Sequence, residues 1–137
     1  MEIQLDEKLD EKYYKRLDDE FNNYAIKNGL ECEYKQFTFT ARENGEVLGM
    51  ITGHSYYNEV HISDLLVFEE NRGKHIGTDL VKFVEDYHKK LGFNEFTLNT
   101  YELQAPLFYK KCGYEVEYVR ENKDNPKLSK YYFIKHI

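Results

Sequence analysis

Apolar side chains recur along the chain with two different spacings. Over residues 7–27 and 75–91 they return every three or four positions, which predicts two amphipathic helices. Asn28-Gly29 and Gly92 follow these segments as helix stops. The marker residues of the first helix are Tyr14, Leu17, Phe21 and Tyr24, and the buried stripe expected on the second is Ile76, Leu80, Phe83, Val84, Tyr87 and Leu91.

Alternating segments predict the strands. A three-strand meander is expected over 35–42, 46–56 and 60–68, with Phe37, Phe39 and Ala41 on one face of its first strand and a hairpin turn at Asn44-Gly45. Further strands are expected at 94–100, 114–120 and 130–136, the last two as a hairpin, with a short helix over 103–111. With a first strand at 1–5, the order is βαβββαβαββ. This order predicts an α/β fold, in the α+β sense of a mixed and mostly antiparallel sheet flanked by helices, in one domain spanning 1–137.

Composition narrows the classes of function. The chain has 137 residues, 41% of them hydrophobic, and a net charge of −6, which disfavours nucleic-acid binding and is compatible with a cationic substrate. Cys32 and Cys112 show no metal-binding spacing, so we expect two reduced thiols, no disulfide and no metal. The amino terminus is polar, and no apolar run approaches the roughly 20 residues that cross a bilayer. We therefore expect a soluble cytoplasmic protein without a membrane partner.

The segment Asn71–Thr78 carries the clearest chemistry. It joins an apolar strand ending in Leu65-Leu66-Val67-Phe68 to a helix, and the free N–H groups and dipole of a helix start favour an anion. Arg72 and Lys74 add positive charge, and Gly73 and Gly77 allow close approach of a phosphate. The glycines lie one residue too close for a nucleotide-hydrolase P-loop, and the G-x-G-x-x-G dinucleotide fingerprint is absent.

Arg72-Gly73-Lys74-His75-Ile76-Gly77 resembles the R/Q-x-x-G-x-G/A acetyl-CoA loop of the GNAT N-acetyltransferases, with His75 where that pattern has glycine. Leu65-Leu66-Val67 resembles the L-x-V element of the same family. The stretch 99–109, ending in Phe108-Tyr109, resembles its later cofactor motif, and Cys112-Gly113-Tyr114 resembles its terminal x-G-F/Y. The resemblance covers the chain from about Lys35 onward.

The resemblance implies that acetyl-CoA lies where two parallel strands, 60–68 and 94–100, splay apart. Tyr109 matches the general acid, and Asp64 is our candidate base, with Glu59 and Glu102 as alternatives. His54 and His61 are expected to be structural. The implied cofactor set is Leu66, Val67 and Phe68 for the pantetheine, Arg72, Gly73, Lys74, His75, Ile76, Gly77 and Thr78 for the pyrophosphate, and Gln104.

The implied reaction is transfer of the acetyl group to a primary amine of a small molecule or peptide, by direct attack in a ternary complex. A non-catalytic acyl-CoA sensor and a general phosphate-ligand binder stay open as alternatives. As a residue of the first helical turn, His75 is expected to have a negative φ, so that its Cβ affects affinity more than binding mode. The edge of the C-terminal hairpin leaves a homodimer open.

Overall fold

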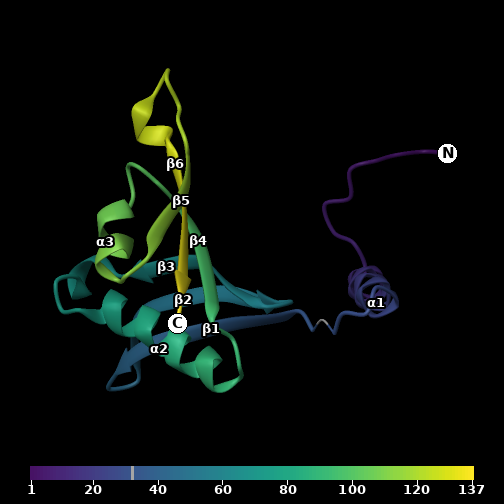
Figure 1. The fold of residues 1–137 in the computed structure, drawn as a ribbon, viewed down its shortest axis with the longest axis horizontal. Helices are drawn as coiled ribbons and strands as arrows, with labels where there is room; N and C mark the ends of the chain where they lie inside the picture. Colours follow the sequence, from purple (N-terminus) through teal and green to yellow (C-terminus); the bar gives the residue numbers. More distant parts are fainter. Residues whose placement is uncertain (32) are drawn as a thin grey trace.

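The computed structural model describes residues 1–31 and 33–137. Figure 1 shows a twisted sheet with helices against one side and an amino-terminal helix set apart from it. The helices are α1 (Glu11–Lys27), α2 (Ile76–Lys90) and α3 (Pro106–Lys111), and 3₁₀ turns lie at Glu69–Asn71 and Pro126–Leu128. The strands are β1 (Lys35–Glu43), β2 (Glu46–Tyr56), β3 (Glu59–Val67), β4 (Glu95–Tyr101), β5 (Glu115–Arg120) and β6 (Lys130–His136).

The strands form one sheet in the order β1-β2-β3-β4-β6-β5. Among the described strands, β3 and β4 are parallel neighbours and the other pairs are antiparallel. The mixed, mostly antiparallel sheet and the β5–β6 hairpin were both predicted, and both are confirmed. Asn44 and Gly45 have φ values of 51° and 82°, as a two-residue turn of the mirror-image type requires.

The amino terminus differs from the prediction. Residues 1–5 form no strand, because they lie away from the sheet and no neighbouring strand pairs with them (Figure 1). Helix α1 begins at Glu11 rather than near Glu7, since the Asp10 side chain accepts a hydrogen bond from the Lys12 N–H at 3.0 Å and caps the helix there. It ends at Asn28 and Gly29, as predicted.

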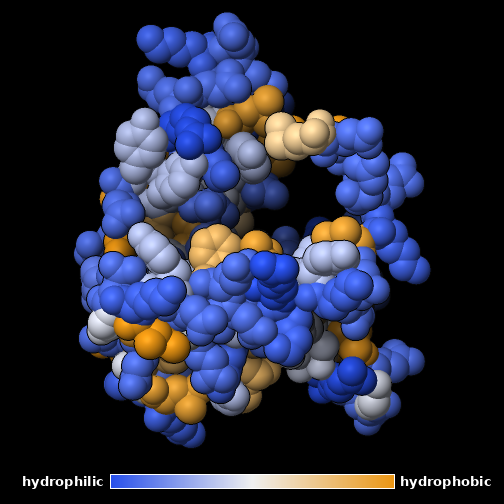
Figure 2. Space-filling model, turned by 90° about the vertical axis from the view of Figure 1, so that its right-hand side faces the viewer, coloured by the Kyte–Doolittle hydropathy of each residue, from blue (hydrophilic) through white to orange (hydrophobic). Residues whose placement is uncertain are grey.

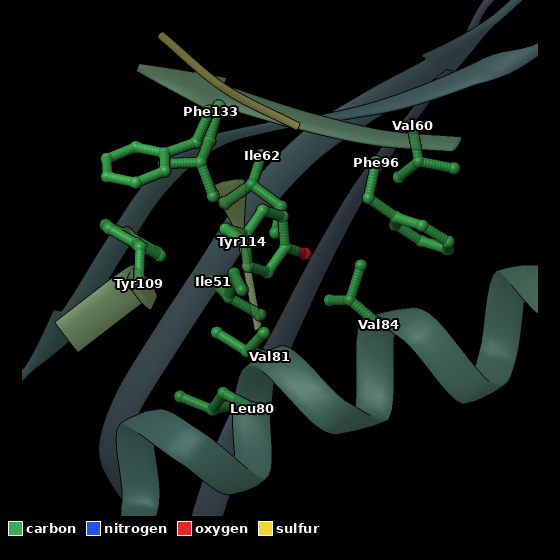
Figure 3. Packing of buried hydrophobic residues seen from close by; sticks show 11 residues of the cluster. Ile51, Val60, Ile62, Leu80, Val81, Val84, Phe96, Tyr109, Tyr114 and Phe133 are labelled. Atoms are coloured by element: carbon green, nitrogen blue, oxygen red, sulfur yellow. The ribbon is translucent and has the colours of Figure 1, made fainter. Parts of the chain in front are cut away.

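The core lies between the sheet and helices α2 and α3. Figure 3 shows Leu80, Val81 and Val84 of α2 pointing at residues of the sheet, among them Ile51 and Ile62. Phe37, Phe39 and Ala41 pack against this core from one face of β1, as predicted.

The predicted stripe of α2 is partly wrong. Phe83, Tyr87 and Leu91 are 53%, 45% and 60% exposed, and the buried positions are Leu80, Val81, Val84, Glu85 and His88. Phe83 and Tyr87 contact Phe39 of β1, and β1 is the edge of the sheet. Side chains over an edge strand are covered on one side only, so aromatic residues at core spacing stay half exposed there.

Helix α1 lies beyond the end of the sheet at which β1 begins and β2 ends (Figure 1). Its marker residues have the predicted helical spacing, yet Ala25 is the one buried residue of the helix. Figure 2, which views the molecule from this side, shows apolar residues around an opening in the surface.

The described residues contain neither a membrane-spanning helix nor a group of side chains suited to a metal ion. Within 1–31 and 33–137, no helix is long and apolar enough to cross a membrane. In the same residues, no three His, Cys, Asp or Glu side chains are grouped to hold a metal ion. Cys112 is a free thiol, whereas Cys32 lies outside the described residues, so the prediction of two reduced thiols is untested.

Candidate active site at the split between β3 and β4

Strands β3 and β4 pair over part of their length and then separate. The parallel ladder joins Glu59–Ile62 to Glu95–Leu98 in four residue pairs. Beyond Ile62, β3 continues along β2 as far as Val67, while β4 continues along β6. The predicted splay is therefore present, and it leaves one side of β3 from Ser63 to Val67 without a neighbouring strand.

A bulge lies at the point where the strands separate. The β2–β3 register skips Ser63, because Gly53 faces Ile62 and Thr52 faces Asp64. The extra residue exchanges the two faces of β3: Ile62 and Leu65 both lie on the core side, and Asp64 and Leu66 lie on the opposite side. Unbroken strand alternation would place Ile62 on the same face as Asp64 and Leu66; the bulge separates them, and Asp64 is consequently exposed.

The same register decides which main-chain groups face the opening. The Phe68 N–H donates to the Leu48 carbonyl of β2 at 3.0 Å. Because backbone direction alternates along a strand, Leu66 also directs its N–H and carbonyl at β2, whereas Leu65 and Val67 direct theirs into the opening. The Val67 carbonyl accordingly accepts a hydrogen bond from Arg72 Nε at 3.0 Å.

The glycine-bearing loop follows β3 and ends at α2. Gly73 has a φ of 79°, and a Cβ there would meet no atom within 4 Å, so this glycine serves backbone conformation rather than packing. His75 has φ 64° and ψ 13°, which is left-handed, and it precedes the first helical residue, Ile76. The expectation of a negative φ for His75 is therefore wrong, and the conformation explains why the family pattern has glycine at this position.

The start of α2 presents unpaired donors to the loop. The first intrahelical bond runs from the Asp79 N–H to the His75 carbonyl, so the N–H groups of Ile76, Gly77 and Thr78 precede it. Together with Arg72, these residues line a hollow of about 330 Å³. A Cβ on Gly77 would lie 3.3 Å from the Phe108 ring, which brings α3 against the start of α2.

A second hollow, of about 520 Å³, lies at the split itself. It is lined by Asp64 and Leu66 from β3, by Asn99 from β4, and by Gln104 and Tyr109 after β4. Thr52 donates its hydroxyl to the Asp64 carboxylate at 3.1 Å.

The three candidate bases fall in different places. Asp64 lines the hollow, whereas Glu59 pairs with Glu95 at the far end of the ladder. Burial raises the pKa of Glu59, and the nearby Glu95 adds to this effect. Glu102 lies in the turn after β4, where its N–H donates to the Ser129 carbonyl. Asp64 is the one of the three that lines this hollow.

Tyr109 is 8% exposed and projects from α3. Its ring packs against Phe108, Tyr114 and Phe133, with ring centroids 5.1 to 6.1 Å away. Burial raises its pKa to about 12, with smaller contributions from Cys112 and Asp64. The phenol is therefore protonated at neutral pH, and the negative charge of Asp64 across the hollow favours this protonated form.

Gln104 lines this hollow rather than the phosphate loop. Its side-chain oxygen accepts from the Tyr101 N–H at 3.1 Å and from the Thr100 hydroxyl at 3.4 Å. This contact fixes the turn from which α3 begins. Thr52 and Asn99 were not singled out in the sequence, because only the bulge register shows that they share a face with Asp64.

A buried polar network supports α3 from behind. Glu85 accepts the Tyr114 hydroxyl at 3.0 Å and the Lys135 ammonium at 3.0 Å and 3.1 Å. Lys135 also donates to the Cys112 carbonyl at the end of α3, at 2.8 Å. Burial raises the pKa of Tyr114, and the nearby Glu85 adds to this effect. A carboxylate spaced like a core residue on α2 was the signal that could have indicated this network.

His54 and His61 lie on the face of the sheet that points away from the core. His61 Nδ1 is 2.9 Å from the Thr97 hydroxyl, and its ring lies 5.3 Å from that of His54. Burial lowers the pKa of His61, with smaller effects from His54 and Lys130. Neither histidine lines the two hollows.

Comparison with known proteins gives one family. The family model described as "Acetyltransferase (GNAT) family" matches residues 2–114. An aminoalkylphosphonate N-acetyltransferase of Salmonella typhimurium is 32% identical over 91 residues, which are 61% of this chain and 59% of that protein. The chain thus spans about three fifths of the length of this curated relative.

Solved structures share the fold. An acetyltransferase from Bacillus cereus matches with a TM-score of 0.78 and 25% identity, covering 100% of this chain and 98% of that one, so its match includes the amino-terminal helix. A GNAT family acetyltransferase from Elizabethkingia anophelis with acetyl-CoA bound matches with a TM-score of 0.66 and 17% identity, covering 86% of this chain and 82% of that one.

Proposed function

The chain belongs to the GNAT acetyltransferase family, and from that premise we propose that it transfers the acetyl group of acetyl-CoA to a primary amine. The observation that carries the proposal is the split between β3 and β4, with Asp64 and Tyr109 lining one hollow. The hollow at the glycine-bearing loop lies next to it, at the end of β3. The acetyl-CoA bound by the Elizabethkingia anophelis relative supports the same donor.

Acetyl-CoA would extend from the hollow at the glycine-bearing loop into the hollow at the split between β3 and β4. The pyrophosphate would accept hydrogen bonds from the first N–H groups of α2 and from Arg72, where helix dipole and side-chain charge add. The pantetheine amides would pair with the main chain of Leu65 and Val67, the two residues that direct their backbone groups into the opening. Leu66 and Phe68 would contribute side chains rather than main-chain bonds. Lys74, Ile76 and Thr78 complete the loop.

The transfer would proceed by direct attack in a ternary complex. The neutral amine nitrogen attacks the thioester carbon, and the carbonyl oxygen becomes an oxyanion that the Val67 N–H can stabilise. Collapse of this intermediate breaks the C–S bond, and the Tyr109 phenol gives its proton to the leaving thiolate. Asp64, held by Thr52, takes the proton that the amine loses, directly or through a water molecule.

The acceptor should be an amine without an anionic group. Among the described residues that line the hollow, Asp64 is the charged one, and it is negative. A carboxylate favours a cationic or neutral amine and repels a phosphonate, so we expect this chain to differ in acceptor from its Salmonella relative. A small polyamine, an aminoglycoside or a peptide amino terminus fits the charge. A cytoplasmic location follows from the need for acetyl-CoA.

The test is thiol release from acetyl-CoA with a panel of amines, comparing Tyr109→Phe with the wild type. We expect turnover to fall about 100-fold or more, the range for loss of a general acid, while acetyl-CoA binding stays unchanged by calorimetry. Tyr118→Phe, which removes an exposed phenol from β5, is the matched control and should keep full turnover. Unchanged turnover in Tyr109→Phe would remove this residue from the acid role.

One observation favours a second function, an acyl-CoA sensor without transfer. A phenol with a pKa of about 12 donates its proton less readily than an ordinary tyrosine, for which the value is 10.0. Tight acetyl-CoA binding with no transfer to any amine of the panel would support the sensor. Binding of ATP in place of CoA would instead indicate a general phosphate-ligand site and contradict both proposals.

A further inference from the structure

Helix α1 carries an apolar face that the described residues of its own chain leave largely uncovered. Tyr14, Leu17, Phe21 and Tyr24 recur at helical spacing and are 55%, 52%, 55% and 68% exposed. A helix of this composition has little stability in water by itself, because most helical stability comes from packing an amphipathic face. We therefore expect this face of α1 to pack against another protein surface.

The sheet has an uncovered face as well. Helices α2 and α3 pack on the core side, and no described helix lies on the opposite side. We call this side the open face, and it comprises His54 of β2, His61 of β3, Thr97 of β4, and Tyr132 and Ile134 of β6. Its side chains are half buried among themselves; the rings of Tyr34 and His54 are stacked, and the His61 ring lies 5.3 Å from that of His54.

Helix α1 lies away from the open face of its own chain (Figure 1). Asn28, Gly29 and Leu30 donate their N–H groups to the carbonyls of the last turn of α1, so the chain leaves the helix in a fixed direction. Between α1 and the nearest part of the sheet, at Tyr34 and Tyr56, lies a hollow of about 800 Å³. The full-length match to the Bacillus cereus structure extends over this helix.

We propose that α1 of one chain packs on the open face of a second copy, and that the exchange is reciprocal. A two-fold dimer then covers both helix faces and both open faces with the same contact. The other route to a dimer, pairing of the hairpin edge, is opposed by β5 itself. That edge strand carries Glu115 and Glu117, and its register with β6 is irregular after Val116.

The buried area suits a stable dimer. A helix of 17 residues is about 25 Å long, enough to cross the strands of the open face at about 4.8 Å spacing. Half-exposed aromatic side chains that bury about 100 Å² each give roughly 400 Å² on the helix and a similar area on the sheet. Two such contacts bury about 1,600 Å², the size of a standard specific interface.

The dimer would also complete the acceptor site. His54 and Thr52 lie on the same face of β2, two residues apart, and Thr52 borders the hollow that contains Asp64. A partner helix on the open face would form the missing wall of that hollow. This last step rests on the proposed function, whereas the dimer itself does not.

The first test is the solution mass of the full chain by light scattering. We expect about twice 16.5 kDa for the wild type, and a shift of at least tenfold in the dimer dissociation constant for Leu17→Glu/Phe21→Glu. Asn23→Glu/Ile26→Glu adds the same two charges to the opposite side of α1, where both residues are exposed, and should leave the dimer intact. A monomeric wild type, or equal loss in both variants, would overturn the proposal.

A mixing experiment tests the reciprocal exchange. Ile134→Glu damages the open face and Leu17→Glu/Phe21→Glu damages the helix, so each alone should be monomeric. An equimolar mixture should form a heterodimer through one intact contact. A helix-to-helix interface, or α1 folding back on its own sheet, leaves the mixture monomeric, and that result would refute the exchange.

Folding and function are checked separately. Circular dichroism and acetyl-CoA calorimetry on each variant establish that the domain is folded, and the masses need no activity. Should the double variant fail to fold, Leu17→Cys and Ile134→Cys on differently tagged chains replace it. A short bismaleimide should join the two tags, and Ile26→Cys should not. Absence of crosslinks from Leu17→Cys would equally overturn the proposal.

Discussion

Replacing His75 by glycine tests the strained step at the start of α2. The left-handed conformation of His75 costs a residue with a Cβ about 1 kcal/mol, and its side chain makes no capping hydrogen bond that would offset this cost. Glycine removes the strain but adds roughly 0.5 kcal/mol of unfolded-chain entropy. The expected gain in unfolding free energy is therefore about 0.5 kcal/mol, or about 2 °C in melting temperature.

The same change should improve binding of the donor. Without a Cβ at residue 75, the pyrophosphate can approach the N–H groups of Ile76 and Gly77 more closely. We expect the dissociation constant of acetyl-CoA to fall by a few-fold, measured by titration calorimetry, while the number of sites stays the same.

Two further variants isolate the cause of the stability gain. His75→Ala keeps a Cβ at positive φ and should gain nothing, whereas Thr78→Gly puts glycine at a helical φ and should lose roughly 0.3 kcal/mol in urea unfolding. The opposite signs for glycine at 75 and 78 are the signature of the left-handed conformation. If His75→Gly unfolds at a lower urea concentration than His75→Ala, the strain argument is refuted.

Three other changes have expected outcomes. Gly49→Ala should lower the free energy of unfolding in urea by about 2 kcal/mol and raise the KM for acetyl-CoA. The added Cβ would lie 2.8 Å from the Leu66 carbonyl oxygen and 3.1 Å from the Val67 Cα, so β3 must move. An unchanged unfolding free energy and KM would contradict this. Lys135→Met should cost about 3 kcal/mol by leaving Glu85 buried and unpaired, and Glu85→Gln/Lys135→Met should recover part of that loss; equal loss in both variants would argue against an unpaired charge. Burial lowers the pKa of His88 below 6.5, so its contribution to stability is complete above that pH and is lost as pH falls toward the folded-state pKa. Unfolding free energies at pH 7 and pH 5 should differ less in His88→Gln than in the wild type, and an identical pH slope would exclude His88 as a source.

Local patterns in the sequence predicted most of the elements. The bounds of β2 and β6 match the expected strands, and the Asn44-Gly45 turn has the expected geometry, because alternation and turn chemistry act over a few residues. The strand expected at residues 1–5 failed for the opposite reason, since a strand exists only when another strand pairs with it.

The details of the site depended on register, which no local pattern contains. The bulge at Ser63 placed Asp64 on the face of the sheet opposite to that of Ile62. Thr52, which pairs with Asp64, and Asn99 line the same hollow as Asp64. The loop motif indicated an anion site, but it could not show that His75 adopts a positive φ. The sequence also could not predict that the apolar face of α1 is exposed. Helical spacing of apolar residues is the same whether the face packs on its own chain or on another.

The short ladder between β3 and β4 divides the sheet into two halves. Four residue pairs join one half, β1-β2-β3, to the other, β4-β6-β5. The strand proposed to hold the thioester belongs to the first half, and Tyr109, on the helix after β4, belongs to the second. In the proposed reaction, the distance from the Tyr109 phenol to the leaving sulfur therefore depends on the angle between the two halves of the sheet, and the core residues packed between the halves fix that angle.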